Sequence, residues 1–228
     1  MPRSTLTAEQ IVRAAIELLD DEGLDGLNMR SLGKRLDSAA TAIYWHIKTK
    51  DELVRLAADA IWDEVEVPDP DSTDWRTAAT AMATGMHAML TRHPWYGQAF
   101  GSHLVYGAGK ARFDDRTLAV YEKAGFAADD ADRAAATVFV FVLGSALGAA
   151  AQVSLTRRMR SRNEDPDVLL ADAMARSAEV AKDFPRLSRR LGTPAARGYT
   201  AAPDRSFSFG LQAVLDGFAF RLGGAGSD

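Results

Sequence analysis

The chain has 228 residues, of which 47% are hydrophobic and 25% are charged, and it contains no cysteine. This composition is typical of a soluble globular protein with one large or two small domains. The absence of cysteine excludes disulfides and thiolate metal sites and fits a reducing, cytoplasmic compartment. The N-terminal sequence MPRSTLTAEQ lacks the apolar segment of a signal peptide.

The net charge of −4 does not by itself indicate a nucleic-acid partner. The distribution of charge is more informative, because residues 28–50 contain five basic residues against one acidic residue, a local net charge of +4. A basic patch on an otherwise acidic chain is the electrostatic pattern of a surface that meets a polyanion.

The first predicted helix begins at Thr7, where Thr7 and Gln10 have the spacing of a capping box. Its apolar residues recur along one face, and Gly23 is placed to end it. That apolar face consists of Ile11, Ala14, Ala15, Leu18 and Leu19.

Two short helices follow. Asn28 caps the first of them, the pair Asp37-Ser38 ends it, and the second covers residues 39–46. Ile43 and Ile47 are spaced to face inward. Three helices in about 45 residues have the size and order of a helix-turn-helix module, whose third helix lies in the DNA major groove. The opposite side of this third helix carries Thr41, Tyr44, Trp45 and Lys48.

The stretch YWHIKTK, residues 44–50, combines large aromatic side chains with positive charge. Three interpretations compete: a core segment, a ligand pocket, or a surface that contacts a polyanion. Because Ile43 and Ile47 already supply the inward side, the spacing favours the surface interpretation for Tyr44 and Trp45.

The segment GLDGLNMRSLGKRLDSAATAIYWHIKTKDEL, residues 23–53, resembles the DNA-binding domain of the tetracycline repressor (TetR) family of transcriptional regulators. The resemblance is strongest over residues 5–62. It continues more weakly along the rest of the chain, where FSFGLQAVLDGF, residues 207–218, is similar to the C-terminal domain of the same family. The family resemblance implies a DNA-binding dimer that responds to a small molecule.

By position, the resemblance implies a set of DNA contacts. Lys48, just past the third helix, is placed to reach a phosphate, and Arg30 has an alternative role as a surface ion-pair partner. Asp37 stands where the family usually has glycine and Met29 where it often has threonine, which bears on the operator sequence. The implied base contacts are Arg30, Ala40, Thr41 and Trp45, and the implied phosphate contacts are Tyr44, His46 and Lys50.

The remaining pattern is also helical, and no alternating strand pattern is sustained, so we expect an all-α fold. We expect a helix-turn-helix DNA-binding domain at residues 1–50 and a larger ligand-binding and dimerisation domain at residues 51–228. A helix begins at Asp51, and an acidic, proline-bearing linker covers residues 66–74. Further helices are expected near residues 75–92, 113–124, 130–156, 168–182 and 204–222, and exposed loops at 157–167 and 185–203.

The predicted helix near residues 130–156 contains an uncharged run, Ala134 to Ala151, close to the minimum length of a membrane span. A single such run favours a buried helix, and no membrane partner is expected. Its Gly144-x-x-x-Gly148 pattern and the apolar face of the last helix suit a four-helix dimer interface, unless both are core helices of a monomer. The candidate interface residues are Gly144, Gly148, Phe207, Leu211, Val214, Leu215 and Phe218.

A methionine and aromatic pattern in the second domain suggests a pocket for a largely apolar effector, although the same pattern is common in a plain core. His87, His93 and His103 lack the spacing of a helical metal pair, and no catalytic motif is present. We therefore expect no metal, no cofactor and no enzymatic activity. The candidate pocket residues are Trp62, Met82, Met86, Met89, Phe100, Phe113, Tyr121 and Phe139.

Together these features predict a homodimeric repressor that binds a palindromic, double-stranded operator and is released by a small molecule. An activator or a ligand-independent DNA-binding protein would share the same DNA-binding domain. An enzyme or a small-molecule carrier that uses the cavity alone is the more distant alternative.

Overall fold

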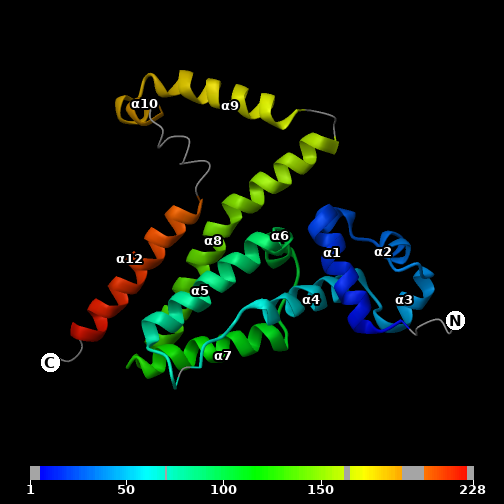
Figure 1. Cartoon of the computed structure of the whole chain (residues 1–228), viewed down its shortest axis with the longest axis horizontal. Coiled ribbons are helices and arrows are strands. Elements are labelled where there is room, and N and C mark those ends of the chain that lie inside the picture. The colour runs from blue at the N-terminus through cyan, green and yellow to red at the C-terminus, as the bar shows by residue number, and fades with distance from the viewer. Residues whose placement is uncertain (1–5, 70, 162–164, 192–202, 225–228) are drawn as a thin grey trace.

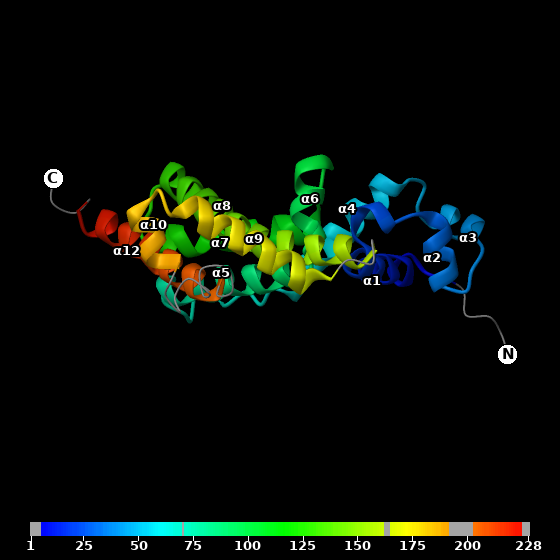
Figure 2. The ribbon, with the colours of Figure 1, turned by 90° about the horizontal axis from the view of Figure 1, so that it is seen from above.

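The computed structural model describes residues 6–69, 71–161, 165–191 and 203–224, and every regular element in these ranges is a helix. The all-α prediction is therefore confirmed for the described residues. Helices α1 to α3 lie at one end of an elongated molecule together with the N-terminus, and α12 lies at the other end (Figures 1 and 2). Helices α5, α7 and α8 fill the space between these ends.

The N-terminal unit consists of α1 (Ala8–Gly26), α2 (Met29–Arg35) and α3 (Ala40–His46). The capping box at Thr7 and Gln10 is present, and the Asn28 side chain accepts hydrogen bonds from the first turn of α2. Gly23 has a left-handed φ of 72°, which kinks α1, but the helix resumes and ends three residues later than predicted.

A tight turn sets α3 against α2. Asp37 adopts a left-handed φ of 46°, a conformation that an aspartate tolerates better than most side chains. Gly33 allows close backbone approach, because a Cβ atom there would lie 2.8 Å from the carbonyl oxygen of Ser38. Leu32 and Ile43 are fully buried between the helices, so the turn and this contact fix the direction of α3.

The second region begins with α4 (Lys50–Ala60), which continues into a short 3₁₀ helix, η1 (Ile61–Glu64). Helix α4 packs against α1 on one side and against α6 and α7 on the other, so it connects the two regions. The remaining helices are α5 (Trp75–Arg92), α6 (Trp95–Ser102), α7 (Ala108–Lys123), α8 (Ala128–Ser161), α9 (Pro166–Ala181), α10 (Pro185–Leu191) and α12 (Pro203–Gly224).

Four features of the second region differ from the prediction. Helix α6 was not predicted. Pro94 follows the end of α5 and also serves as the N-cap of this new helix. Helix α7 begins at Ala108, five residues earlier than predicted. Helix α8 extends into the first part of the predicted loop at 157–167 and ends at Ser161, and α10 lies in the other predicted loop, where Pro185 occupies its first position. Residues 162–164 and 192–202 of those loops lie outside the described residues.

Helix α8 is long and apolar enough to cross a bilayer by length and composition alone. It packs along α5, α7 and α12, and Val142 is fully buried in that contact. Only 29% of its most apolar window is buried, however, and Val140 and Leu147 are exposed. The prediction of a buried helix therefore holds for one face of α8 and is wrong for the other.

Candidate functional site

The outward side of α3 is exposed as predicted. Trp45 is 81% exposed and Tyr44 is 45% exposed, whereas Ile43 between α2 and α3 is fully buried. Thr41 and His46 are also exposed. A large aromatic side chain on a short helix, which none of the described segments covers, is available to a partner, and this favours the surface interpretation over the core interpretation.

The other predicted DNA contacts surround this face. Arg30 is exposed in the first turn of α2, and Ala40 is partly buried at the start of α3. Lys48 donates a hydrogen bond of 2.9 Å to the carbonyl oxygen of Tyr44, with its ammonium 5.7 Å from the Trp45 ring. Lys50 donates a hydrogen bond of 2.8 Å to the carbonyl oxygen of Leu24. Both lysines thus stabilise the ends of helices in addition to supplying positive charge.

Arg35, which contributes to the basic count of residues 28–50, is part of the fold instead. Its guanidinium pairs with Asp21 and Glu17 on α1, and the hydrogen bond with Asp21 raises the pKa of Arg35. This pair fixes α2 on α1. The positive charges left around the exposed face are therefore those of Arg30, Lys34, Lys48 and Lys50.

A polar cluster joins the N-terminal unit to the second region. The buried imidazole of His93, 2% exposed, lies 2.8 Å from Asp20 on α1 and 3.0 Å from Glu64 on η1. Asp20 also accepts a hydrogen bond from the indole of Trp95, and its carbonyl oxygen accepts one from Arg157. Arg157, predicted to be a solvated loop residue, is instead an anchor between α8 and α1.

The charge state of His93 follows from this geometry. Burial alone would lower its pKa, but the hydrogen bonds and negative charges of Asp20 and Glu64 raise the pKa above its ordinary value of 6.5. A protonated imidazole donates to both carboxylates at once. The contact between the two regions is therefore strongest when His93 is charged.

A cavity of about 400 Å³ lies between α5, α7 and α8. Its wall includes Met82, Met86, Phe113, Tyr121 and Phe139, all of which the sequence proposed as pocket residues. A cavity of this size, with mostly apolar walls and a few polar groups, is the usual form of a small-molecule site.

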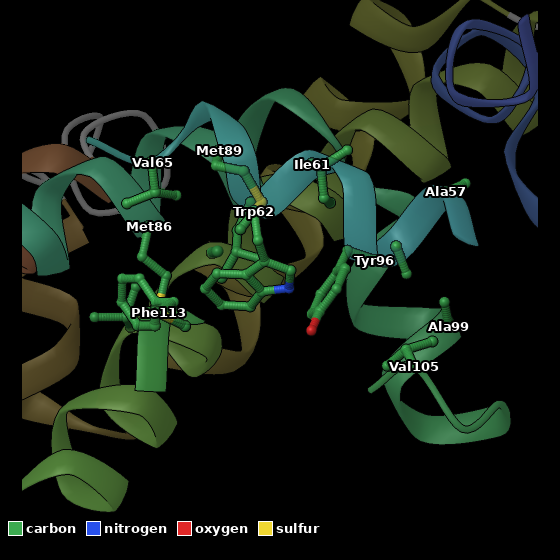
Figure 3. Close-up of a cluster of buried hydrophobic side chains, with 14 of the residues drawn as sticks. Ala57, Ile61, Trp62, Val65, Met86, Met89, Tyr96, Ala99, Val105 and Phe113 are labelled. Carbon is green, nitrogen blue, oxygen red and sulfur yellow. The ribbon is translucent and has the colours of Figure 1, made fainter. Parts of the chain in front are cut away.

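Three other proposed pocket residues do not line this cavity. Trp62 lies behind the wall, with its ring 4.8 Å from the Phe113 ring. Met89 is buried on the same face of α5 as Met82 and Met86, about one turn further along and outside the cavity lining. Phe100 is 45% exposed, with its ring 5.6 Å from that of Phe139. Figure 3 shows Trp62, Phe113 and Met86 packed as one buried cluster.

The sequence did not identify the polar part of the pocket. Lys110 is only 8% exposed, and its ammonium pairs with Asp114 one helical turn later on α7. Because the predicted helix began at residue 113, the i, i+4 spacing of these two residues was not recognised. Asp132, at the start of α8, adds a second carboxylate to the lining.

The start of α7 is also bonded directly to α4. The backbone N–H of Lys110 donates a hydrogen bond of 3.1 Å to the carboxylate of Asp59 on α4. Gly109 makes the close approach possible, because a Cβ atom there would lie 2.4 Å from the carbonyl oxygen of Asp59. The start of the pocket helix α7 is thus held directly on α4, which packs against α1 of the N-terminal unit.

Two buried polar atoms lie near this wall. The indole N–H of Trp62 and the hydroxyl of Tyr96 have no partner within hydrogen-bond geometry among the described residues. The two rings meet edge to face with centroids 5.9 Å apart, and the indole nitrogen points toward Tyr96 (Figure 3). Burial raises the pKa of Tyr96 to about 12, an effect that the nearby indole only partly opposes, so its hydroxyl remains protonated at neutral pH.

The residues proposed for a dimer interface separate into two groups. Phe207, Leu211 and Leu215 are buried in the core of the same chain, and the ring of Phe207 stacks on that of Phe141, 5.9 Å away. The structure therefore assigns these three residues to the core and not to a surface. Val214 and Phe218 are partly buried, whereas Gly144 and Gly148 are exposed on α8 with open space beside them.

The histidines do not form a metal site in the described part of the chain, where no three potential ligands gather closely enough to hold an ion. The ring of His87 stacks on that of Phe207 at 4.0 Å, and His103 lies 3.4 Å from Asp51. With His93 held by two carboxylates, each of these histidines takes part in a structural contact.

Comparisons with known proteins indicate the same family for both regions of the chain. Residues 67–222 match the family described as "Tetracyclin repressor-like, C-terminal domain", and residues 11–57 match "Bacterial regulatory proteins, tetR family". An HTH-type transcriptional regulator of Saccharopolyspora erythraea is 32% identical, with 82% of this chain and 83% of that protein covered. The class A tetracycline repressor protein of Escherichia coli is 30% identical, with coverages of 95% and 92%.

Solved structures show the same fold. Apo ActR from Streptomyces coelicolor superimposes with a TM-score of 0.75 at 25% identity, covering 97% of this chain and 99% of that chain. The complex of ActR with actinorhodin has a TM-score of 0.73 at 27% identity, with coverages of 95% and 96%. The cavity between α5, α7 and α8 thus occurs in a fold that holds a small molecule in at least one relative.

Proposed function

This chain belongs to the tetR family of bacterial regulatory proteins, and from that premise we propose that it is a cytoplasmic, homodimeric repressor which a small effector releases from a palindromic operator. The observation that carries the proposal is the exposed aromatic face of α3, with Trp45 81% exposed, in a chain whose second region also holds a mostly apolar cavity with a few polar groups. The first feature suits DNA and the second suits a small molecule. The family is one of transcriptional regulators and not of enzymes.

DNA recognition is assigned to the N-terminal unit, residues 1–50, and regulation to residues 51–228. In this arrangement α3 enters the major groove, with Thr41, Tyr44 and Trp45 at the base edges and the backbone. Arg30 is placed at the start of α2 to pair with a guanine. Ala40 offers a methyl group only, and His46, Lys48 and Lys50 supply phosphate contacts along the rim.

Dimerisation is assigned to the uncovered face of α8 and α12. Gly144 and Gly148 allow a close approach of helices, and Leu147 on the same side is 46% exposed. Phe209 and Phe220 of α12 are 79% and 82% exposed and add a large apolar surface. Two copies that join these faces form a four-helix interface and place two α3 helices on one side of the dimer.

The effector acts through α4. A molecule between α5, α7 and α8 displaces the start of α7, where Asp59 of α4 accepts a hydrogen bond from the backbone of Lys110. Helix α4 packs directly on α1, so the spacing of the two α3 helices changes. Consecutive half-sites lie about 34–36 Å apart, so a changed spacing lowers operator affinity, and the effector binds the released state more tightly.

The experiment that tests this proposal is an anisotropy titration of the full-length protein on DNA from the upstream region of its gene and on sites selected from random DNA. We expect tight, salt-dependent binding that Arg30→Ala and Tyr44→Ala each weaken by about tenfold or more. Arg133→Ala removes an exposed charge of α8 as a control and leaves the affinity unchanged. Binding that neither variant affects would contradict the assignment of α3.

The direction of regulation is tested separately. Reporter expression from the bound promoter falls when a repressor is present, and it rises when an activator is present. An effector that binds the protein without changing operator affinity would favour a ligand-independent DNA-binding protein of the same fold.

A further inference from the structure

The first turn of α3 exposes methyl groups and very little that can form a hydrogen bond. Ala39, just before the helix, is exposed, and Ala40 and Ala42 are half-buried. Thr41 is exposed between them and carries both a hydroxyl and a methyl group. The N-terminal residues of a recognition helix are the ones that contact base edges. The part of α3 that would meet the bases first is therefore almost entirely apolar.

The polar side chains on either side of α3 are engaged within the chain. The amide of Asn28 donates to the carbonyl oxygen of Gly26 at 3.1 Å and to the hydroxyl of Ser31 at 2.9 Å. Its oxygen accepts two hydrogen bonds from the first turn of α2. The carboxylate of Glu52 accepts one from the backbone of Lys48. Amides and carboxylates are the groups that read the amino groups of adenine and cytosine, and these two candidates already serve as caps.

Asp37 carries the one carboxylate of residues 28–50, and it lies outside the helix. It is exposed in the turn before α3, where its φ is 46°. A carboxylate close to a duplex is repelled by the phosphates on both strands. Direct contact with a base is therefore unfavourable for Asp37, which leaves the base edges to the face of α3 itself.

Trp45 extends the apolar surface of α3. It is 81% exposed, and the ammonium of Lys48 lies 5.7 Å from its ring centroid. Lys48 is itself held at the end of the helix, since it donates a hydrogen bond of 2.9 Å to the carbonyl oxygen of Tyr44. The indole N–H is a donor and offers no acceptor. The ring thus adds apolar area and a single donor to the outward side.

A surface of methyl groups and one large ring can distinguish one base from the others. Thymine presents an apolar group in the major groove, its C5-methyl, which alanine, the threonine methyl and aromatic rings contact. Guanine presents two acceptors, and the exposed Arg30 in the first turn of α2 is the strong donor beside α3. The chemistry of this face therefore matches thymine, with a guanine nearby.

We propose that the outward face of α3 reads thymine through its C5-methyl group, with Thr41 as the specificity-determining residue. The methyl groups of Ala40 and Ala42 and the ring of Trp45 complete the apolar contact. Each half-site then carries an A·T pair opposite the first turn of α3. The inference rests on the DNA-binding regulator proposed above and specifies which base chemistry that regulator recognises.

Replacement of thymidine by deoxyuridine tests this contact, because deoxyuridine pairs normally and lacks only the C5-methyl group. Anisotropy titrations of the full-length protein compare the operator selected from random DNA with copies that carry the exchange at one symmetrical position in both half-sites. We expect at least one position where the exchange weakens binding about tenfold, since two methyl contacts are lost per dimer. If no exchange weakens binding by more than about twofold, the proposal is overturned.

Variants of Thr41 separate its methyl group from its hydroxyl. Thr41→Ser keeps the hydroxyl and loses the methyl, so we expect the preference for thymine over uracil to fall to about threefold or less. Thr41→Val keeps the methyl and should retain a preference of about tenfold. The opposite pattern, with the preference kept in Thr41→Ser and lost in Thr41→Val, would refute the methyl contact. Circular dichroism confirms that each variant is folded.

Asp37→Gly is the matched control for the turn. Glycine suits the left-handed φ at this position and removes the carboxylate. We expect the variant to bind all sites somewhat more tightly, because a negative charge near the phosphates is lost, and to keep the full preference for thymine. A preference that disappears in Asp37→Gly would show that the turn, and not the face of α3, distinguishes the bases.

The same titrations separate this inference from the proposed function. If the protein binds the operator in a manner that depends on Arg30 and Tyr44 but does not distinguish thymine from uracil, the DNA-binding regulator stands and the thymine contact fails. If it binds no DNA in a salt-dependent manner, both fail.

Discussion

The end of the molecule to which we assign DNA binding and the end that holds the pocket are built in different ways. On α3, Ile43 is fully buried and Trp45, two positions later, is 81% exposed, so one short helix separates core from recognition surface. In the pocket, Met82, Lys110 and Phe139 come from three different helices. A surface that reads a rigid polymer can be encoded locally, whereas a cavity exists only after distant helices have packed.

The two ends share one hydrophobic core through α1, α4 and α6, and polar contacts add to this packing. Asp59 of α4 bonds to the start of α7, and His93 bridges Asp20 of α1 and Glu64 of η1. Hydrogen bonds of this kind have discrete arrangements and are directional, so they suit a junction that must transmit a displacement. Substitutions in the core, at the junction and on the outward face of α3 should therefore have separable effects on stability, on its pH dependence and on operator affinity.

The largest effect is expected from the inward side of α3. Ile43→Ala should lower the free energy of unfolding by about 2–5 kcal/mol, because it opens a cavity between α2 and α3. Trp45→Ala should change it by less than about 0.5 kcal/mol and yet abolish specific operator binding. Urea unfolding monitored by circular dichroism, together with operator anisotropy, measures both. A large loss of stability in Trp45→Ala would place this side chain in the core.

An intermediate effect is expected at the junction. Because the pKa of His93 is raised above 6.5 in the folded chain, its contribution to stability is complete below about pH 6.5 and is lost as the pH rises through the raised pKa. Arg92 and Arg157 also face this cluster, but arginines stay charged throughout the range. The free energy of unfolding should therefore decrease from pH 6.5 upward.

His93→Gln tests this assignment. It should lower the free energy of unfolding at pH 6 by about 2 kcal/mol, since it removes hydrogen bonds to charged groups, and it should flatten the pH dependence. The control is His103→Gln, since His103 faces a single, 86% exposed carboxylate of Asp51. Denaturant titrations at several pH values provide the measurement. If the free energy of unfolding of His93→Gln depends on pH as steeply as that of the unmodified protein, His93 is not the source of the pH dependence.

The smallest effect is expected at Lys48, which belongs both to the fold and to the recognition surface. Loss of its hydrogen bond at the end of α3 in Lys48→Met should cost about 0.3–1 kcal/mol of stability. Loss of a phosphate contact should reduce the slope of log affinity against log salt by about one. If the salt slope is unchanged, Lys48 acts only as a helix cap.

Much of the N-terminal unit was accessible from the sequence alone. The caps at Thr7 and Asn28 and the 3.6-residue spacing of Ile43 and Ile47 are local signals, and the structure agrees with them. The exposure of Tyr44 and Trp45 followed from the same spacing. Hydrogen bonds between residues three or four positions apart determine these features, so no distant part of the chain was needed.

Tertiary structure decided the rest. Helix α12 carries phenylalanines on several sides, and packing buries Phe207 to 5% exposure while leaving Phe209 at 79% and Phe220 at 82%. Helical spacing places Phe207 on a different face from Phe209 and Phe220, but hydrophobicity states only that a side chain avoids water and not which neighbour covers it. The ion pair of Lys110 and Asp114 had a recognisable spacing, but only the packing of α5, α7 and α8 around it made it the polar corner of a cavity.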